Sequence, residues 1–172
     1  MFKFIKIKKI SHGFTLIELL VVIGIISLLA TIITINVQSS RQKARCAKRR
    51  ADIVSVQVPL EAYYDTNNAY PNTSGSWWAI SATYGSHDVT GSNGWIPNLA
   101  PTYIRRLPSD PADDNGSRSY LYQSDALNYK VLSHFPQTDG CVLGDSRDTL
   151  YDPVRTTWAW MVCSGEPACS SW

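Results

Sequence analysis

The sequence contains few of the residues from which metal centres and catalytic sites are usually built. It has only three histidines, and its four cysteines include no C-x-x-C pair, so a zinc site is not indicated. The motifs G-x-S-x-G, H-E-x-x-H, Walker A and G-x-G-x-x-G do not occur. His87 and His134 lie outside any recognisable catalytic setting and are expected to be surface or sheet histidines. We therefore expect a protein that is not an enzyme and needs no cofactor.

The N-terminal region lacks the A-x-A-like site at which a secretory signal peptide is cut, and its apolar run is too long for one. The run extends from Phe14 to Ile35, and as a helix its roughly 22 residues would span about 33 Å, enough to cross the hydrocarbon core of a bilayer. A plain membrane anchor would not explain Glu18, because a charge inside the bilayer costs on the order of 2.5–3.5 kcal/mol. A cut before the run, after Gly13, explains the glycine, the carboxylate and the four preceding lysines together.

Positive and negative charges nearly balance over the whole chain, with 16 Lys and Arg against 14 Asp and Glu. From Pro59 onward, however, there are six basic residues and twelve acidic ones. This excess of acid argues against a head that binds nucleic-acid phosphates. Four basic residues precede the apolar run, and six cluster just after it, between Arg41 and Arg50. Orientation in a membrane follows the side richer in Lys and Arg, so charge counting alone leaves the topology open.

Small apolar residues beyond the apolar run recur at spacings of three, four and seven, which marks one face of a continuing helix. We expect this face to pack against the head or against a neighbouring helix. Pro59 lacks a backbone donor and is predicted to kink or end the helix nearby. The face consists of Val37, Ala44, Ala47, Ala51, Val54, Val58 and Ala62.

Alternating side chains in the last third of the chain predict an antiparallel sheet. The segments 119–124 and 128–135 alternate around tyrosines and are joined by a few residues, which predicts a hairpin. A third strand is expected within 156–163. Residues 72–98 are rich in Gly, Ser, Thr and Asn and contain three tryptophans, which is typical of an irregular loop held in place by aromatic side chains.

The segment Gly13–Ile23, with the sequence GFTLIELLVVI, closely resembles the processing and methylation segment of type IV pilins and type II secretion pseudopilins. The resemblance implies that a membrane peptidase, the prepilin peptidase, cuts after Gly13 on the cytoplasmic side and methylates the new amine of Phe14. Glu18 then stands where the family keeps its glutamate. In a filament this carboxylate would neutralise the terminal amine of a neighbouring subunit, so that two costly charges become one pair.

The resemblance continues into the distal helix and into the stretch before the sheet, where the matching segments are Leu60–Tyr64, Ala69–Pro71 and Leu99–Pro111. It implies an α+β, pilin-like fold, in which a long N-terminal helix packs on a small antiparallel sheet. The expected organisation is a leader peptide at 1–13, a transmembrane and polymerisation helix at 14–35, the distal half of the long helix at 36–65 and an extracytoplasmic head at 66–172.

The function that the resemblance implies is that of a structural subunit of a type IV pilus or a type II secretion-like filament. The expected partners are identical or related pilin subunits, the prepilin peptidase and an inner-membrane assembly platform, and no nucleic acid. The protein would lie in the bacterial inner membrane with its N-terminus inside and then enter a periplasmic or cell-surface filament. Two alternatives remain, a minor pilin whose aromatic-rich head acts as an adhesin and a DNA-uptake pseudopilin.

Disulfides are permitted if the head lies outside the cytoplasm. We expect one bridge among Cys141, Cys163 and Cys169. The pair Cys141–Cys163 is preferred, because it would tie a loop to the last strand, and Cys163–Cys169 is the alternative. Cys46 lies on the helix among basic residues, far along the chain from the others, and is assigned no partner.

An acidic stretch follows the predicted hairpin and contains Asp139, Asp145, Asp148 and Asp152. In the major pseudopilins that the chain resembles, a loop in this region binds calcium through aspartates and backbone carbonyls, and such hard oxygen ligands suit Ca²⁺. The spacing here differs from that pattern, and Cys141 interrupts it. We therefore favour a solvated acidic loop and keep Asp139, Asp145 and Asp148 as weak calcium candidates.

Overall fold

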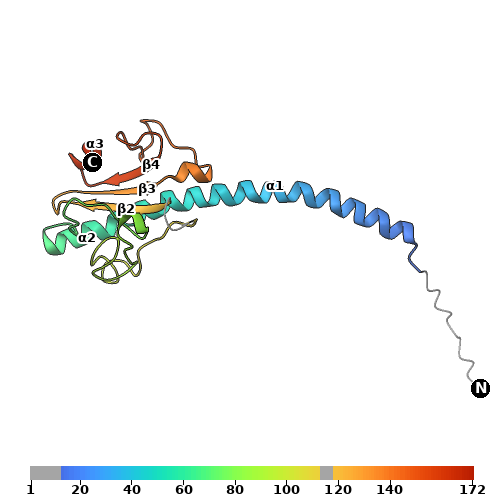
Figure 1. Ribbon diagram of the computed structural model, residues 1–172, viewed down its shortest axis with the longest axis horizontal. Coiled ribbons are helices and arrows are strands. Elements are labelled where there is room, and N and C mark those ends of the chain that lie inside the picture. Colours follow the sequence, from blue (N-terminus) through green and yellow to red (C-terminus); the bar gives the residue numbers. More distant parts are fainter. Residues whose placement is uncertain (1–12, 113–117) are drawn as a thin grey trace, which may run out of the picture. The chain divides into compact units, whose positions relative to one another are not determined.

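The computed structural model describes residues 13–112 and 118–172, except for the side chains of residues 32–36. Figure 1 shows the order of the elements along the chain. The chain divides into two compact units, Met1–Ser40 and Arg41–Trp172. Helix α1, Leu16–Ser55, begins in the first unit and ends in the second. Nearly all of the expected leader, including its lysines, lies outside the described residues.

Helix α1 begins with a reciprocal cap between Thr15 and Glu18. The N–H of Thr15 donates to Oε2 of Glu18 at 2.8 Å, and the N–H of Glu18 donates to the hydroxyl oxygen of Thr15 at 3.3 Å. This capping box gives partners to two backbone donors at the start of the helix. Among the residues that the structure describes, no helix is both long and apolar enough to qualify as a membrane span.

The helical path is interrupted one turn before Pro59, as predicted. Helix α1 ends at Ser55, and helix α2, Gln57–Asn67, follows after one residue. Pro59 has no N–H to donate to the carbonyl of Ser55, and its ring crowds that carbonyl. Regular hydrogen bonding therefore stops at this point. Helix α2 is followed by its C-cap Asn68, which adopts the left-handed conformation common after helix C-termini (φ 52°).

The sheet has four antiparallel strands in the order β1-β2-β3-β4. Strands β2, Ser119–Ser124, and β3, Tyr129–His134, form the predicted hairpin. Strand β4, Ala159–Cys163, confirms the third predicted strand, although it begins at Ala159 and not at Thr156. Strand β1, Trp78–Ala79, was not predicted, because two residues are too few to show an alternating pattern.

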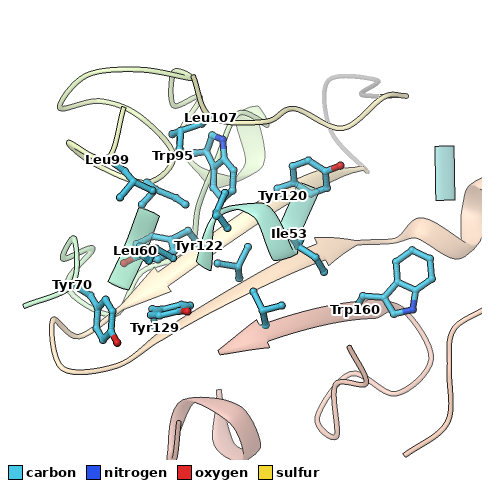
Figure 2. Packing of buried hydrophobic residues seen from close by; sticks show 14 of the residues in the cluster. Ile53, Leu60, Tyr70, Trp95, Leu99, Leu107, Tyr120, Tyr122, Tyr129 and Trp160 are labelled. Carbon is cyan, nitrogen blue, oxygen red and sulfur yellow. The ribbon is translucent and has the colours of Figure 1, made fainter. Parts of the chain in front are cut away.

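Both helices bury side chains against one face of the sheet, and Figure 2 shows this cluster. Ile53, Val56 and Leu60 are fully buried there. Much of the opposing surface comes from tyrosines of β2 and β3, whose rings supply large apolar areas. Their hydroxyl groups are paired; that of Tyr120, for example, donates to Asp52 of α1 at 2.8 Å. The core is therefore aromatic but leaves these polar ends with partners.

The small-residue face of the helix does not pack on the head, so this part of the prediction is wrong. Val58 is 77% exposed and Val54 is 45% exposed, and Ala47 and Ala51 are exposed as well. The buried set is offset by two residues, which turns a helix by roughly 200° and so places the two sets on opposite sides. Packing of the small face against a neighbouring helix stays a prediction. The set that faces the head is Cys46, Arg49, Ile53, Val56 and Leu60.

Apart from β1 and one short 3-10 helix, the described residues between α2 and β2 are irregular and held by aromatic side chains, as predicted for 72–98. Trp95 is fully buried, and its indole N–H donates to the carbonyl of Pro108 at 3.1 Å. On the outer face of the sheet, the half-buried Trp158 packs against a small cluster that includes Leu121 and Leu132. The remaining short elements are the 3-10 helices η1, Ala82–Tyr84, and η2, Pro136–Asp139, and the helix α3, Ala168–Ser171.

Candidate assembly site

The residues predicted for processing and assembly lie open at the start of α1. A Cβ atom added to Gly13 would meet no other atom within 4 Å, and Phe14 is 84% exposed. Glu18 is also exposed and accepts hydrogen bonds from the N–H and the hydroxyl of Thr15, at 2.8 and 2.7 Å. The bond between Gly13 and Phe14 is therefore accessible. Cleavage, methylation and subunit contact at these residues stay predictions.

An extended apolar surface follows this site on the first unit. The large apolar side chains from Phe14 to Leu29 are between 48% and 84% exposed. Hydroxyl groups in this stretch are turned back on the helix, since Ser27 donates to the carbonyl of Ile23 at 2.7 Å and so presents no free donor. Apolar surfaces of this extent mark contacts with lipid or with another protein.

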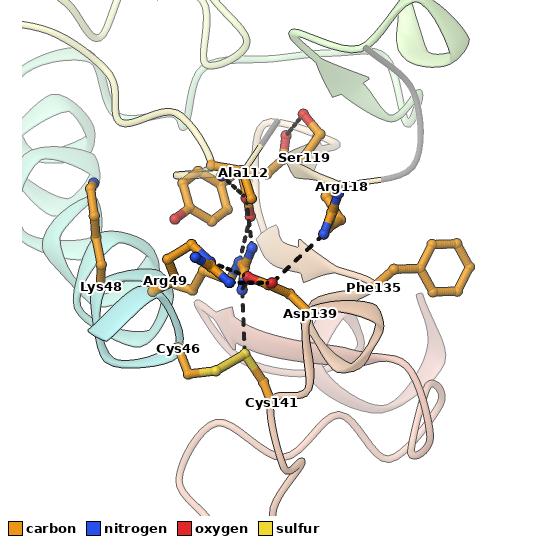
Figure 3. Close-up of polar contacts among 12 residues, drawn as sticks. Cys46, Lys48, Arg49, Ala112, Arg118, Ser119, Phe135, Asp139 and Cys141 are labelled. Atoms are coloured by element: carbon orange, nitrogen blue, oxygen red, sulfur yellow. Dashed lines mark hydrogen bonds and ion pairs between the residues drawn. A yellow bond between two sulfur atoms is a disulfide. The ribbon is translucent and has the colours of Figure 1, made fainter. Parts of the chain in front are cut away.

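On the second unit, Arg49 of α1 is buried and held by two aspartates (Figure 3). Its guanidinium donates to both carboxylate oxygens of Asp110, at 2.7 and 2.9 Å, and to Asp139 at 2.9 Å. The side chains of Arg49 and Asp110 are 0% exposed. Burial disfavours the charged form of Arg49 and by itself would lower its pKa. The hydrogen bonds and negative charges of the two aspartates outweigh this effect and raise the pKa of the guanidinium.

Two further arginines of α1 hold the end of η2 and the segment that follows it. Arg45 donates to both oxygens of Asp139, at 2.5 and 2.6 Å. Arg50 donates to both oxygens of Asp148, at 2.7 and 2.9 Å. Hydrogen bonds from Arg45 and then Arg49 lower the pKa of Asp139, and those from Arg50 lower the pKa of Asp148. Such two-pronged contacts fix orientation as well as distance.

Two disulfides connect the four cysteines, and they correct the predicted pairing. Cys46 is joined to Cys141 and Cys163 to Cys169. The preferred pair Cys141–Cys163 is therefore wrong, and the alternative Cys163–Cys169 is present. The chain turns back after β4 and brings Cys169 to a Cα–Cα distance of 5.5 Å from Cys163. Cys141 instead follows the segment that Arg45 and its neighbours hold against α1, which places it beside Cys46.

Sequence reasoning missed Cys46 and Arg49 as contacts of the head, although a signal for them exists. Together with Ile53, Val56 and Leu60 they follow spacings of three and four residues, the pattern of a buried helix face. A cysteine and an arginine within that pattern are polar or reactive residues at core positions. Such residues need partners from elsewhere in the chain.

The calcium candidates do not converge on one point. Asp139 and Asp148 are bound by different arginines, and Asp145 accepts hydrogen bonds from the N–H and the guanidinium of Arg147, each at 2.9 Å. Within residues 13–112 and 118–172, no group of three or more His, Cys, Asp or Glu side chains is placed to hold a metal ion. The preferred solvated loop is also wrong for three of its four members, since Asp139 is 11%, Asp148 15% and Asp152 0% exposed. Asp145 is 62% exposed.

The observed architecture is the α+β, pilin-like fold, in which a long N-terminal helix packs at its distal end on a small antiparallel sheet. At the start of this helix, residues 8–34 match the family described as the prokaryotic N-terminal methylation motif. The structure and this motif together define a pilin-like protein with a prepilin N-terminus.

Proteins named type II secretion system core protein G are similar to this chain over more than half of its length. The protein from Pectobacterium carotovorum subsp. carotovorum is 38% identical over 101 residues, which are 59% of this chain and 62% of the relative. The protein from Aeromonas hydrophila is 34% identical over 112 residues, which are 60% and 69%. That from Escherichia coli (strain K12) is 34% identical over 106 residues, which are 59% and 66%. The chain belongs to the type II secretion system core protein G family, the major pseudopilins. No solved structure matches the chain.

Proposed function

We propose that this chain is a structural, non-enzymatic subunit of a type II secretion-like filament, assembled through α1 after residues 1–13 are removed. The observation that carries the proposal is the methylation motif at the start of an exposed apolar helix whose last turns are built into a folded head. The named relatives support it, since they are core proteins of type II secretion systems.

The proposed assembly step is the pairing of a terminal amine with a carboxylate. After a cut at Gly13, the amine of Phe14 is a cation one helical turn from Glu18. When subunits stack with a small axial offset, Glu18 of one can neutralise the amine of the next. Each charge is costly alone in an apolar surrounding, and the pair is much less so.

The proposed surroundings follow from the same segment. Residues 14–35 would lie in the bacterial inner membrane with the N-terminus in the cytoplasm, and the subunit would then pass into a periplasmic or surface filament. Its partners would be identical or related subunits, the prepilin peptidase and an inner-membrane assembly platform. The exposed apolar side chains between Phe14 and Leu29 support both a lipid and a subunit contact.

Mass spectrometry of the mature N-terminus tests this proposal. In cells with the assembly machinery we expect a chain that begins at methylated Phe14. Gly13→Ala should keep the leader attached, whereas Gly24→Ala should be processed normally. Gly24 is the control, because it lies in α1 a short distance after the proposed cut, and an added Cβ there also meets no atom within 4 Å. An unmodified Met1, a cut beyond Ala30, or normal processing of Gly13→Ala would contradict the assignment.

The two alternative functions receive less support. An adhesin that uses its aromatic side chains needs them at the surface, but Trp95 and Trp160 are buried and the other four tryptophans are half-buried. A DNA-uptake role would require salt-dependent DNA binding, and the excess of acidic residues after Pro59 predicts none.

A further inference from the structure

We infer that the segment from Asp139 to Asp148, here called the acidic loop, is held by arginine cations of α1 and by a disulfide in place of a divalent metal ion. Folding of the head then requires no calcium, and assembly requires oxidation of Cys46 and Cys141. The statement about assembly rests on the proposed filament function. The statement about folding does not.

The oxygen atoms that a calcium ion would need are already occupied. Both carboxylate oxygens of Asp139 accept hydrogen bonds from Arg45, and one of them also accepts from Arg49. The backbone carbonyl of Asp139 accepts from the side-chain amide of Gln42 at 2.8 Å. Carboxylate and carbonyl oxygens are the ligands that Ca²⁺ takes in proteins. Both carboxylate oxygens and the backbone carbonyl oxygen of Asp139 therefore already accept hydrogen bonds, and a metal ion would have to displace these donors.

The positive charge already present around Asp139 also disfavours the binding of a metal cation there. Besides Arg45 and Arg49, the guanidinium of Arg118 approaches its carboxylate at 3.9 Å. Three positive groups thus surround one aspartate that is only 11% exposed. A divalent ion brought to this place would be repelled by all three, and the repulsion is weakly screened in a partly buried site.

The other members of the acidic loop give no better site. Asp148 has both oxygens on Arg50, and one of them also accepts from the N–H of Leu150 at 3.1 Å. Asp145 is paired with Arg147 on the exposed side of the loop. The aspartates are thus directed to separate guanidiniums and do not gather around a common centre.

The disulfide joins the same two segments as the arginines. Cys46 follows Arg45 on α1, and Cys141 lies two residues after Asp139. Arg49 donates to the sulfur of Cys141 at 3.3 Å, so the buried cation touches the covalent link directly (Figure 3). One turn of α1 therefore supplies both the cations and the covalent bond that hold the start of the acidic loop.

Thermal unfolding of the full-length protein in detergent tests the folding statement. We expect the same melting temperature with a chelator and with millimolar calcium, and no saturable calcium binding by calorimetry. Arg45→Gln and Arg50→Gln should each lower the melting temperature by about 4 °C. Arg41→Gln on the same helix is the matched control and should leave it unchanged, because Arg41 is exposed. A saturable rise with calcium would overturn the inference, and so would Arg45 and Arg50 variants that melt like the control.

Filament formation in cells that contain the assembly machinery tests the statement about assembly. Wild-type filaments should persist in calcium-depleted medium, and the double variant Cys46→Ser/Cys141→Ser should lose them. Cys163→Ser/Cys169→Ser, which removes the other disulfide, should keep them. Loss of wild-type filaments on calcium depletion, or normal filaments without the Cys46–Cys141 bridge, would overturn this part. If the wild type forms no filaments in any medium, the proposed function fails, and the melting experiments still decide how the loop is held.

Discussion

At the scale of single residues, Arg49 is the side chain that most constrains the head. Its planar fork meets both oxygens of Asp110 and still reaches Asp139, which a lysine ammonium could not do from one position. A buried guanidinium is tolerated only because these carboxylates offset its desolvation. The contact is directional, so it specifies which side of α1 turns toward the segment before β2 and toward the acidic loop.

Removing the Arg49 side chain should lower the free energy of unfolding far more than removing an exposed arginine. We expect Arg49→Met to lower the free energy of unfolding by about 3–5 kcal/mol, because Asp110 is then left charged and buried with its main partner gone. Arg41→Met should change it by less than about 0.5 kcal/mol. Urea unfolding followed by tryptophan fluorescence measures both values. Similar values for the two variants would show that the buried ion pair does not stabilise the head.

Acid should weaken the head through Asp139 and Asp148. The pKa of each is below its ordinary value of 3.8 in the folded protein, so the unfolded chain binds protons more readily. The stabilisation that these two aspartates give the folded head is therefore fully present above the unfolded-state pKa. It is lost as the pH falls through the lower folded-state pKa. Asp148→Asn should melt below the wild type at neutral pH, and the difference in melting temperature should shrink as the pH falls through the folded-state pKa of Asp148. Melting curves recorded across this range decide the point, and an equal gap at both ends would contradict it.

At the scale of elements, local patterns predicted the strands better than they predicted the helix face. The hairpin β2–β3 was visible because tyrosines alternate with other residues on short segments with a brief connection. The helix carries two faces with the same spacing, one of small residues and one that includes Arg49 and Cys46. Hydropathy predicted that the face of small residues would be buried, but the buried face is the one with Arg49 and Cys46. This face can be buried because partners distant in the sequence neutralise the arginine and bond the cysteine. Those partners, Asp110 and Cys141, cannot be found from local spacing.

The two disulfides should differ in how much they stabilise the head. Cys46–Cys141 closes 95 residues and Cys163–Cys169 closes six. In the chain-entropy description, removing the first costs about 4–5 kcal/mol and removing the second about 2 kcal/mol. Denaturant unfolding of Cys46→Ser/Cys141→Ser and of Cys163→Ser/Cys169→Ser compares them under one set of conditions. A larger loss for the short bridge would mean that the long one closes a loop already ordered in the unfolded chain.

At the scale of the whole molecule, the two units are stabilised by different means. The second has its own aromatic core, ion pairs and disulfides. The first is a helix whose described apolar side chains are mostly exposed, so within the single chain it lacks the tertiary packing that stabilises most helices. The motif at Gly13–Ile23 was evident from the sequence because it is contiguous. The arginine contacts were not, because they join residues about ninety positions apart.

Glu18 has two possible roles, and a pair of variants separates them. In the folded chain it closes the capping box with Thr15, a task that glutamine also performs. The proposed pairing with a neighbouring subunit's amine requires a negative charge, which glutamine lacks. Glu18→Ala and Glu18→Gln should therefore both enter the membrane and be processed normally, yet both should assemble poorly. Membrane fractionation, mass spectrometry of the N-terminus and counting of filaments measure these three steps. If Glu18→Gln assembles like the wild type while Glu18→Ala fails, the carboxylate acts through the helix cap, and charge neutralisation between subunits is not what drives filament assembly.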